Sequence, residues 1–257
     1  MALIKSISGI RGTIGGLPNK NLTPLDIVRL TSAYAQWLKE INDGLIYVVT
    51  GRDARISGLM VQTLVNQTLI GMGINVFDLG LSTTPTVSFA IPIEKSQGGI
   101  ILTASHNPKE WNALKLLNSS GEFVDDVEGK KIMDFAMAEK FRYSNIEALG
   151  IIRRKENYIE KHIDAILALK KVNVRGIKRL KFKVVVDGVN SSGGIAIPQL
   201  LKKLGVEYVK IHCTPNGKFP HNPEPLIENL GDLCEEVLKN KADFGIAVDP
   251  DVDRLVF

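Results

Sequence analysis

The most informative segment of this sequence is Gly98-Gly99-Ile100-Ile101-Leu102-Thr103-Ala104-Ser105-His106-Asn107-Pro108. Its apolar run at 100–102 is typical of a short buried strand, and the Asn-Pro pair after it is turn chemistry. Ser105 therefore comes just past the end of a buried strand, where α/β sheets carry their reactive groups.

A second stretch has the same form and reads Phe244-Gly245-Ile246-Ala247-Val248-Asp249-Pro250-Asp251-Val252-Asp253-Arg254. It too consists of a glycine, an apolar strand and an abrupt polar loop, which here holds three carboxylates within five residues. We expect Ser105 and these aspartates to form two halves of one site.

The two halves of the chain repeat one order of elements: strand, Ser/Gly loop, helix, strand, Thr-Pro loop, helix and strand. Matching dipeptides mark the copies, with Thr50-Gly51, Thr84-Pro85 and Gly99-Ile100 in the first and Asp187-Gly188, Thr214-Pro215 and Gly245-Ile246 in the second. Chance alignment of common residues is the alternative. The matching order favours two copies of one α/β layer unit with right-handed crossovers. Side-by-side copies would bring Ser105 and Asp249 to one cleft.

Length and composition agree with this organisation. A chain of 257 residues with 44% hydrophobic and 23% charged residues is long enough for two globular domains, which we expect at 1–150 and 151–257. Local patterns predict a Gly-rich segment at 5–16, a helix from Thr23 to about Ile41, and a hairpin formed by 111–117 and 122–124.

The overall charge and cysteine content exclude several protein classes. The net charge of +4 is spread without a basic block, which argues against nucleic acid as a partner. Cys213 and Cys234 lie in no metal-binding spacing and are expected to be free thiols. No apolar run suits a signal peptide or a membrane span, so we expect a cytoplasmic protein without a membrane partner. Neither the charge distribution nor the composition indicates the oligomeric state.

The triple-aspartate loop indicates a metal site. Carboxylates at 249, 251 and 253 repel one another, and a hard divalent cation relieves that repulsion. A set of oxygens without His or Cys favours Mg²⁺ or Ca²⁺ over zinc. Arg254 stands where an EF-hand needs its turn glycine, which excludes that motif. A solvated acidic turn is the alternative, but it explains poorly why the carboxylates directly follow a buried strand.

Several other side chains are candidates for the same site. Ser105 lacks the G-x-S-x-G context of a hydrolase nucleophile, and His106 beside it serves either in proton transfer or in holding the loop. Lys115 is either a solvated strand lysine or a cation facing the cleft. Arg11, in the Gly-rich segment, suits a phosphate group. For Arg52 and Arg55, with Asp53 nearby, we expect a structural ion-pair loop rather than contact with a ligand.

Together these motifs resemble the α-D-phosphohexomutase family, which includes phosphoglucomutase, phosphomannomutase and phosphoglucosamine mutase. The resemblance runs in order over the whole chain and is carried by Gly-Ile-Arg-Gly (9–12), Gly-Arg-Asp-Ala-Arg-x-Ser-Gly (51–58), Thr-Ala-Ser-His-Asn-Pro (103–108), Trp-Asn-Ala-Leu-Lys (111–115) and Asp-Pro-Asp-Val-Asp-Arg (249–254). It implies an α/β fold of two tandem, similar three-layer α/β/α domains with mixed sheets flanked by helices. These would be the first two domains of a four-domain family.

The resemblance also implies an activity and roles for the site residues. Ser105 matches the serine that carries a phosphoryl group, and Asp249, Asp251 and Asp253 match the Mg²⁺ ligands, with an oxygen of the phosphoserine completing the set. Lys115 matches a proton-transfer residue, and the residues around the phosphoserine are Arg11, His106, Lys115 and Arg254. The family interconverts hexose 1-phosphate and hexose 6-phosphate, with a hexose 1,6-bisphosphate as intermediate and activator. Glucose, mannose and glucosamine phosphates all stay open as the substrate.

Two departures from the family pattern matter. Family members often have Tyr-Asn-Gly before the lysine, where this chain has Trp111-Asn112-Ala113. The family's sugar-recognition and phosphate-clamping loops come later than Phe257. We therefore expect an N-terminal piece with little mutase activity of its own.

Two alternatives remain on the sequence alone. One is a phosphatase of the haloacid-dehalogenase kind, with Asp249 as nucleophile and Ser105 incidental. The other is a metal-stabilised sugar-phosphate-binding module without turnover. Phosphate on Ser105, an acyl phosphate on Asp249, or binding without either would distinguish the three.

Overall fold

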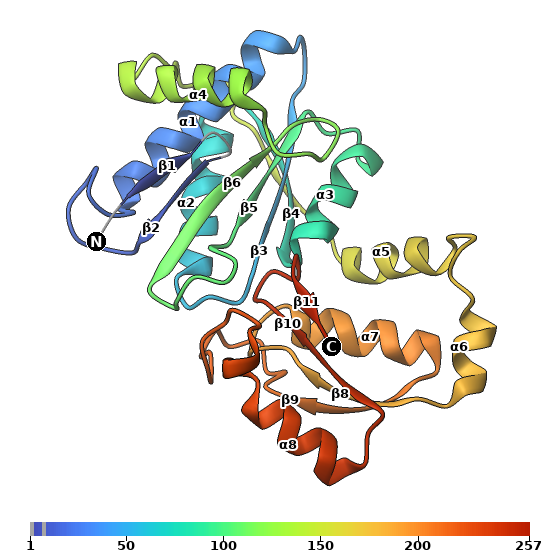
Figure 1. The fold of residues 1–257 in the computed structure, drawn as a ribbon. Helices are drawn as coiled ribbons and strands as arrows, with labels where there is room; N and C mark the ends of the chain where they lie inside the picture. The colour runs from blue at the N-terminus through green and yellow to red at the C-terminus, as the bar shows by residue number, and fades with distance from the viewer. Residues whose placement is uncertain (1–2, 7–8) are drawn as a thin grey trace.

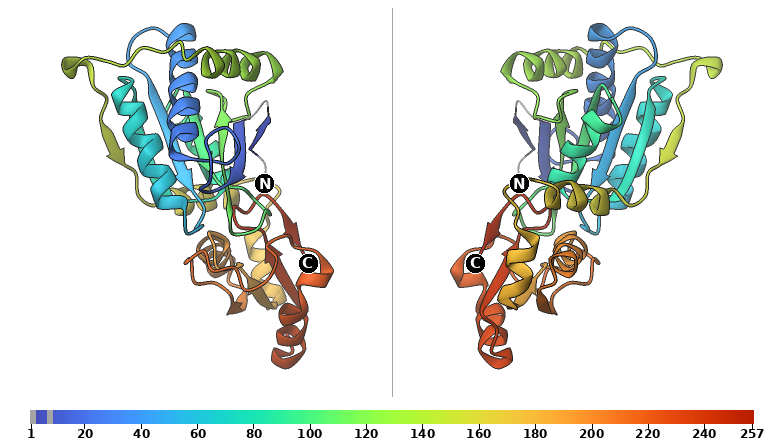
Figure 2. Two further views of the ribbon diagram at one scale, coloured as in Figure 1. Left: turned by 90° about the vertical axis from the view of Figure 1, so that its left-hand side faces the viewer. Right: turned by 90° about the vertical axis from the view of Figure 1, so that its right-hand side faces the viewer.

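The computed structural model describes residues 3–6 and 9–257 (Figure 1). Ile7 and Ser8, part of the Gly-rich segment expected at 5–16, lie outside the described residues. The described elements form two α/β units, a larger one from the first part of the chain and a smaller one from the second, arranged end to end (Figure 2).

The larger unit is built on a mixed sheet. Within the described part of the chain, its strand order is β1-β2-β6-β5-β3-β4-β7, with β3 parallel to both β4 and β5, and β6 antiparallel to both β5 and β2. Its strands are β1 (Ile4–Ser6), β2 (Gly9–Thr13), β3 (Tyr47–Arg52), β4 (Asn75–Leu81), β5 (Gly98–Leu102), β6 (Trp111–Leu117) and β7 (Ile152–Arg154). Its helices are α1 (Pro24–Ile41), α2 (Gly58–Gly71), α3 (Thr84–Ile93), α4 (Asp126–Ala138) and the 3₁₀ turn Ile146–Ala148.

The smaller unit has a sheet of its own, in the order β11-β10-β8-β9. Its strands are β8 (Lys183–Asp187), β9 (Glu207–Ile211), β10 (Phe244–Val248) and β11 (Leu255–Val256). Its helices are α6 (Val174–Leu180), α7 (Gly193–Leu204), α8 (Gly231–Asn240) and the 3₁₀ turn Ile227–Asn229. Helix α5 (Tyr158–Leu167) lies between the units and contacts both α3 and α7.

Strand alternation explains why helices cover both faces of each sheet. Neighbouring strand residues point to opposite faces, so Val48 and Val49 of β3 enter different cores. Val48 packs with the helices α1 and α2, and Val49 packs with Val87 and Ile91 of α3. The smaller sheet divides likewise, with Val184 on the α7 side and Val185 on the α8 side. The expected α/β/α layering is therefore confirmed.

The internal repeat predicted from the sequence is confirmed by the topology. Strands β6-β5-β3-β4 of the larger sheet and β11-β10-β8-β9 of the smaller sheet have the same order and the same pattern of parallel and antiparallel neighbours. In this comparison β5 corresponds to β10, so the loops that carry Ser105 and Asp249 leave equivalent strands.

The division between the units was expected at residue 150, but the larger sheet runs past that point. Strand β7 pairs with β4 in parallel, with Val76 opposite Ile152 and Asp78 opposite Arg154. We therefore propose a boundary after Arg154, because a strand that completes one sheet belongs to that unit's core.

Two local predictions were wrong or incomplete. The predicted hairpin forms only in part. Residues 118–121 turn the chain, and 122–124 return antiparallel to the end of β6 through the bridge Leu117–Phe123 and two backbone hydrogen bonds. The main partners of β6 are β2 on one side and β5 on the other. The Gly-rich segment contains the strands β1 and β2, which the sequence analysis did not predict. Both outcomes involve the pairing of β2 with β6, because these two strands lie far apart in the sequence and local patterns do not report such a pairing.

The cysteines and the helices bear on two further expectations from the sequence. Cys213 and Cys234 are both free, as expected. Across the described residues, no helix combines the length and the apolar character that crossing a membrane requires.

Candidate active site

The loops after β5 and β10 meet at the junction of the two units. The hydroxyl Oγ of Ser105 donates to Oδ2 of Asp249 at 2.6 Å, and it lies 3.4 Å from Oδ1 of Asp253. Ser105 is 8% exposed and has a left-handed backbone with φ of +49°. This conformation is uncommon outside glycine, and it marks a position that the surrounding structure holds firmly.

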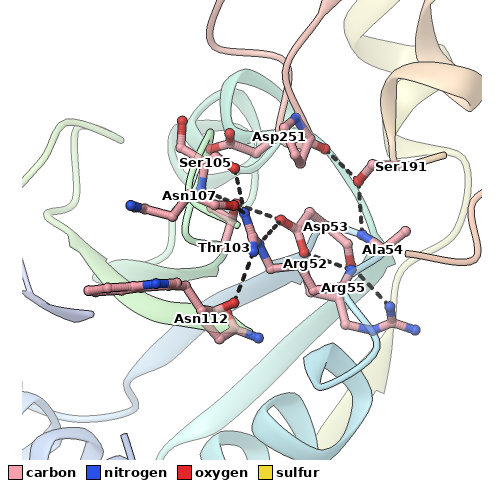
Figure 3. Close-up of polar contacts among 12 residues, drawn as sticks. Arg52, Asp53, Ala54, Arg55, Thr103, Ser105, Asn107, Asn112, Ser191 and Asp251 are labelled. Atoms are coloured by element: carbon pink, nitrogen blue, oxygen red, sulfur yellow. Dashed lines mark hydrogen bonds and ion pairs between the residues drawn. The ribbon is translucent and has the colours of Figure 1, made fainter. Parts of the chain in front are cut away.

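A set of contacts fixes the aspartate loop against the larger unit. The hydroxyl of Ser191 donates to the carbonyl of Pro250 at 2.7 Å and accepts from the backbone N–H of Ala54 at 3.1 Å (Figure 3). The backbone N–H of Thr84, at the start of α3, donates to the carbonyl of Asp251 at 2.8 Å. The junction is therefore held by directional bonds as well as by packing.

The three aspartates of this loop point at one another. Asp249, Asp251 and Asp253 each offer a carboxylate oxygen, and these oxygens all lie within 4.8 Å of one another. Asp249 and Asp251 are fully buried. Burial, reinforced by the charge of Asp251, raises the pKa of Asp249 to about 8. The cluster thus holds more negative charge than its surroundings stabilise.

The donor atoms of this cluster fit a hard divalent cation. Oδ1 of Asp251 is buried and has no hydrogen-bond partner among the described residues. An orphaned carboxylate oxygen beside two other carboxylates is the environment that Mg²⁺ or Ca²⁺ satisfies, since both prefer oxygen ligands. The residues Asp249, Asp251 and Asp253 could therefore hold such an ion.

Lys115 faces the aspartates rather than solvent. It lies on β6, and its Nζ is 2.9 Å from Oδ2 of Asp251 and 3.2 Å from Oδ2 of Asp253. Burial alone would lower the pKa of Lys115, but the two carboxylates outweigh it and raise that pKa. For Asp251, burial is likewise outweighed, because Lys115 and the hydroxyl of Thr84 hold its pKa below the usual value. In this arrangement Lys115 is an ammonium ion.

Arg55 shapes the loop that carries Ser105. Its Nε bonds Oδ2 of Asp53 at 3.0 Å in a fully buried ion pair, as expected (Figure 3). The same expectation was wrong for Arg52, which donates to the side chain of Gln62 and to the backbone carbonyl of Asp53. The other two guanidinium nitrogens donate at 2.5–2.9 Å to backbone carbonyls of the loop, those of Ser105, Asn107, Pro108 and Trp111. The Asp53 carboxylate also accepts from the Thr103 hydroxyl at 2.7 Å, and that hydroxyl accepts the N–H of Ser105. The loop is therefore built around one buried guanidinium.

A cleft of about 360 Å³ opens above Ser105. The predicted site residues that line it are Arg11, Ser105, His106, Lys115, Asp253 and Arg254, while Asp249 and Asp251 lie beneath. Burial and the nearby charges of Arg254 and Arg11 lower the pKa of His106, so its ring favours the neutral form. Arg254 also bonds Glu224 at 2.9 Å. The open side of the cleft is thus lined by cationic groups, which suits an anionic ligand.

Three contributors were not singled out from the sequence. Thr84 donates to Oδ2 of Asp251 at 2.5 Å, Ser191 bridges the two units, and Glu224 positions Arg254. The available signals for the first two were the Thr84-Pro85 dipeptide and the Ser/Gly loop of the repeat, which contains Ser191. No local pattern marks Glu224, because its partner is 30 residues away.

Comparison with known families gives matches over both units. The model described as "Phosphoglucomutase/phosphomannomutase, alpha/beta/alpha domain I" matches residues 4–143, and the corresponding domain II model matches residues 160–257. The triple-aspartate loop thus falls within the domain II match and Ser105 within the domain I match.

Individual relatives carry the same name or a related one. The chain is 36% identical over 249 residues to a phosphoglucomutase/phosphomannomutase of Thermococcus kodakarensis, covering 96% of this chain and 54% of the relative. It is 29% identical to a phosphoglucosamine/phosphogalactosamine mutase of Sulfurisphaera tokodaii, covering 100% of this chain and 55% of that protein. Among solved structures, a putative phosphomannomutase from Thermus thermophilus superposes with a TM-score of 0.85 at 27% identity, covering 99% of this chain and 56% of that one. The chain spans about half the length of the curated relatives it matches.

Proposed function

The chain belongs to the phosphoglucomutase/phosphomannomutase family, and from this premise we propose that it carries the phosphoserine and metal-binding machinery of a phosphohexomutase. The proposed reaction interconverts a hexose 1-phosphate and a hexose 6-phosphate of the glucose, mannose or glucosamine series. A phosphoryl group on Ser105 passes to the substrate, and the resulting bisphosphate returns its other phosphoryl group to Ser105.

One observation carries this proposal. The Ser105 hydroxyl lies 2.6 Å from Asp249 although 144 residues separate them in the chain. Without a cation, the three carboxylates that face this hydroxyl would repel an anionic phosphoryl group. The same hydroxyl becomes a good phosphoryl carrier once a cation neutralises those carboxylates, because phosphoryl transfer depends mainly on positioning and charge neutralisation.

We propose that Asp249, Asp251 and Asp253 hold Mg²⁺, with a phosphoserine oxygen as a further ligand. When bound, the ion would neutralise charge on the phosphoryl group and orient it. The unpartnered Oδ1 of Asp251 and the raised pKa of Asp249 support this assignment.

The chain's own cations have separate proposed tasks. In the transfer, the P–O bond to Ser105 breaks, a bond from phosphorus to a sugar hydroxyl oxygen forms, and the hydroxyl proton passes to water. Lys115 would give a proton to the serine oxygen and then regain one from water, so that no net proton is gained or lost. Arg11 and Arg254, on the wall of the cleft, would bind phosphate oxygens. Lys115, held as an ammonium by Asp251 and Asp253, would protonate the departing serine oxygen, which is the proton-transfer role implied by the resemblance. His106, 3.4 Å from the Ser105 hydroxyl, would orient that group.

The geometry argues against Asp249 as a phosphatase nucleophile. Its Oδ2 accepts from Ser105, and its Oδ1 accepts from the backbone N–H groups of Asp253 and Arg254 at 3.1 and 3.2 Å. Asp249 is also fully buried beneath the cleft. An in-line attack needs an oxygen that faces the substrate, and in this arrangement Ser105 lines the cleft instead.

Phosphate mapping tests the proposed function. The purified chain is incubated with glucose 1,6-bisphosphate and Mg²⁺, and its intact mass and peptide map are recorded. We expect one added phosphoryl group, located on the peptide that contains Ser105. Phosphate on Asp249, trapped as an acyl phosphate, would instead support the phosphatase. Binding of the bisphosphate without any covalent phosphate would support the binding module.

Removing one carboxylate tests the metal site. Substituting Asp251→Asn is expected to weaken Mg²⁺ binding by at least about tenfold, since even outer-shell substitutions at metal sites have effects of that size. Isothermal titration calorimetry measures the affinity. The matched control is Asp134→Asn, an exposed acid on α4, which should bind Mg²⁺ as the unmodified chain does. Equal affinity in the two variants would contradict the assignment.

A further inference from the structure

A second group of metal-binding side chains lies in the smaller unit, apart from the carboxylate cluster. Asp187 at the end of β8, His212 just after β9 and His221 in the following loop each offer a ligand atom, and these atoms all lie within 4.8 Å of one another. Asp187 is buried at 1% exposure, and the two histidine side chains are 23% and 18% exposed. The group is therefore enclosed on one side and open to water on the other.

The hydrogen bonds of His221 identify which of its nitrogens is free to coordinate. Its Nδ1 lies 2.8 Å from the backbone carbonyl of Asn222, which can only accept, so Nδ1 carries the hydrogen. In a neutral ring Nε2 then has a lone pair, and it faces Oδ2 of Asp187 at 3.0 Å. Two lone pairs at that distance repel unless a proton or a cation lies between them.

This arrangement is the one that metal-binding histidines usually show. A ring N–H that donates to a backbone carbonyl fixes the tautomer and turns the other nitrogen toward the ion. Two ligands of a tetrahedral zinc ion lie about 3.4 Å apart, so the observed 3.0 Å between Nε2 and Oδ2 needs only a small opening.

The remaining ligands have supporting contacts as well. Oδ1 of Asp187 accepts the backbone N–H of Val189 at 2.9 Å, which fixes the carboxylate. Nε2 of His212 lies 3.1 Å from Oδ2 of Asp232, so His212 would coordinate through Nδ1 while its Nε2–H donates to that carboxylate. Cys213 is excluded as a ligand, because its thiol faces the carbonyl of Val186 and burial raises its pKa to about 11.

We propose that Asp187, His212 and His221 form a second metal site, which takes a zinc-class divalent cation and leaves its outward position to water. Two imidazoles and one carboxylate favour Zn²⁺, Co²⁺ or Ni²⁺ over Mg²⁺, which prefers oxygen alone. The donor set therefore separates this site chemically from the triple-aspartate cluster. The proposal does not depend on the proposed mutase activity.

Such an ion would fasten the loop 212–225 to the end of β8. That loop contacts the candidate active site at two points: the ring of Phe219 stacks on Arg55 at 5.1 Å, and Glu224 bonds Arg254 at 2.9 Å. A tether through His212 and His221 would therefore hold the two side chains that support Arg55 and Arg254. The role we infer is structural, with an indirect effect on the shape of the cleft.

Zinc binding in the presence of excess Mg²⁺ tests the proposal, because excess Mg²⁺ would compete with Zn²⁺ for the all-oxygen aspartate cluster. The metal-free chain is dialysed against Zn²⁺, and retained zinc is measured by mass spectrometry; Co²⁺ replaces Zn²⁺ for a visible spectrum. We expect one zinc per chain, a Co²⁺ spectrum of low coordination number and a higher melting temperature with Zn²⁺. His212→Gln and His221→Gln should each reduce zinc affinity at least about tenfold. His162→Gln, on α5, is the matched control and should leave it unchanged.

In the competing account, His221 is protonated and forms an ion pair with Asp187 without any metal. The hydrogen bond to Asp187 raises the pKa of His221, which favours that protonated form. This account predicts that ¹⁵N resonances of His221 show both ring nitrogens protonated and do not respond to Zn²⁺. That result, or equal zinc retention in the His221→Gln and His162→Gln variants, would overturn the proposal. If a variant fails to fold, the unmodified chain still provides a test. Its melting temperature should rise with Zn²⁺ if the site binds the ion, and an unchanged melting temperature would contradict the proposal.

Discussion

Replacing Ser105 by alanine is expected to abolish incorporation of a phosphoryl group from glucose 1,6-bisphosphate. The Ser105 hydroxyl is the one that lines the cleft while also bonding the aspartate cluster. The neighbouring hydroxyls are committed elsewhere: Thr103 donates to Asp53, and Thr84 donates to Asp251. Neither is free to take over the role of carrier, so we expect complete loss rather than a reduced rate. The readout is intact mass, followed by peptide mapping.

Magnesium binding separates this loss from a loss of structure. Asp249, Asp251 and Asp253 keep their oxygens in the Ser105→Ala variant, so its affinity for Mg²⁺ should stay within a few-fold of the original. Ser105→Gly is a useful second variant, because glycine adopts the backbone φ of +49° without strain. Ser119→Ala, at an exposed turn, is the control and should be phosphorylated normally. Undiminished phosphorylation of Ser105→Ala would rule out Ser105 as the carrier.

Replacing Arg55 by methionine is expected to lower the free energy of unfolding by roughly 3–5 kcal/mol, the range found when one partner of a buried ion pair is removed. Asp53 would keep a fully buried charge without its counterion, and burial already raises the pKa of Asp53 despite Arg55 beside it. The loop carbonyls bonded by Arg55 would also lose their donor. Urea unfolding measures the change.

Three further variants show whether the effect arises from this network. Arg55→Lys should recover little, because an ammonium cannot reproduce the planar fork that reaches several carbonyls at once. Adding Asp53→Asn to Arg55→Met should restore part of the stability by removing the unpaired charge. Arg52→Met is the matched control: Arg52 bonds Gln62 and one carbonyl, so its loss is expected to cost about 1 kcal/mol. An Arg55→Met chain as stable as Arg52→Met would contradict the assigned role.

Loss of Arg55 should also affect the proposed activity. Because Arg55 bonds the carbonyls on both sides of His106, the backbone that presents Ser105 would lose its fixed conformation. Phosphorylation of Ser105 should therefore fall sharply under conditions in which the Arg55→Met chain is still folded. Limited proteolysis of residues 105–111 would report the same loosening directly.

Local chemistry made much of this molecule predictable. Several features depend on residues that are close neighbours in the chain. They are the strand and loop of residues 98–108, the strand and loop of residues 244–254, the Thr23-Pro24 start of α1 and the order of the repeat. Apolar alternation, caps and turn residues report such short-range preferences reliably. The kinds of residue in the candidate site could be predicted for the same reason, because each stands in a short, recognisable motif. They are a serine, three aspartates and several cations.

Partners distant in the chain were harder to predict. The bond from Arg55 to the carbonyl of Ser105 joins residues 50 positions apart, and the bond from Thr84 to Asp251 joins residues 167 positions apart. The choice of β2 and β5 as neighbours of β6 depends on the order of strands in the whole sheet. A given side chain or strand edge can form its hydrogen bonds with many different partners. Composition and residue spacing therefore do not show which partner it has in the folded chain.

Residue order was enough to predict the two repeated α/β units and the chemical types gathered at the ends of β5 and β10, because both follow from short-range periodicity and turn chemistry. The folded structure was needed to show that Lys115 faces Asp251 rather than water, and that Asp187, His212 and His221 converge. Those outcomes depend on how the two sheets pack end to end and how their loops close. The free energy of that packing comes from contacts between many segments of the fold, so no single segment specifies it.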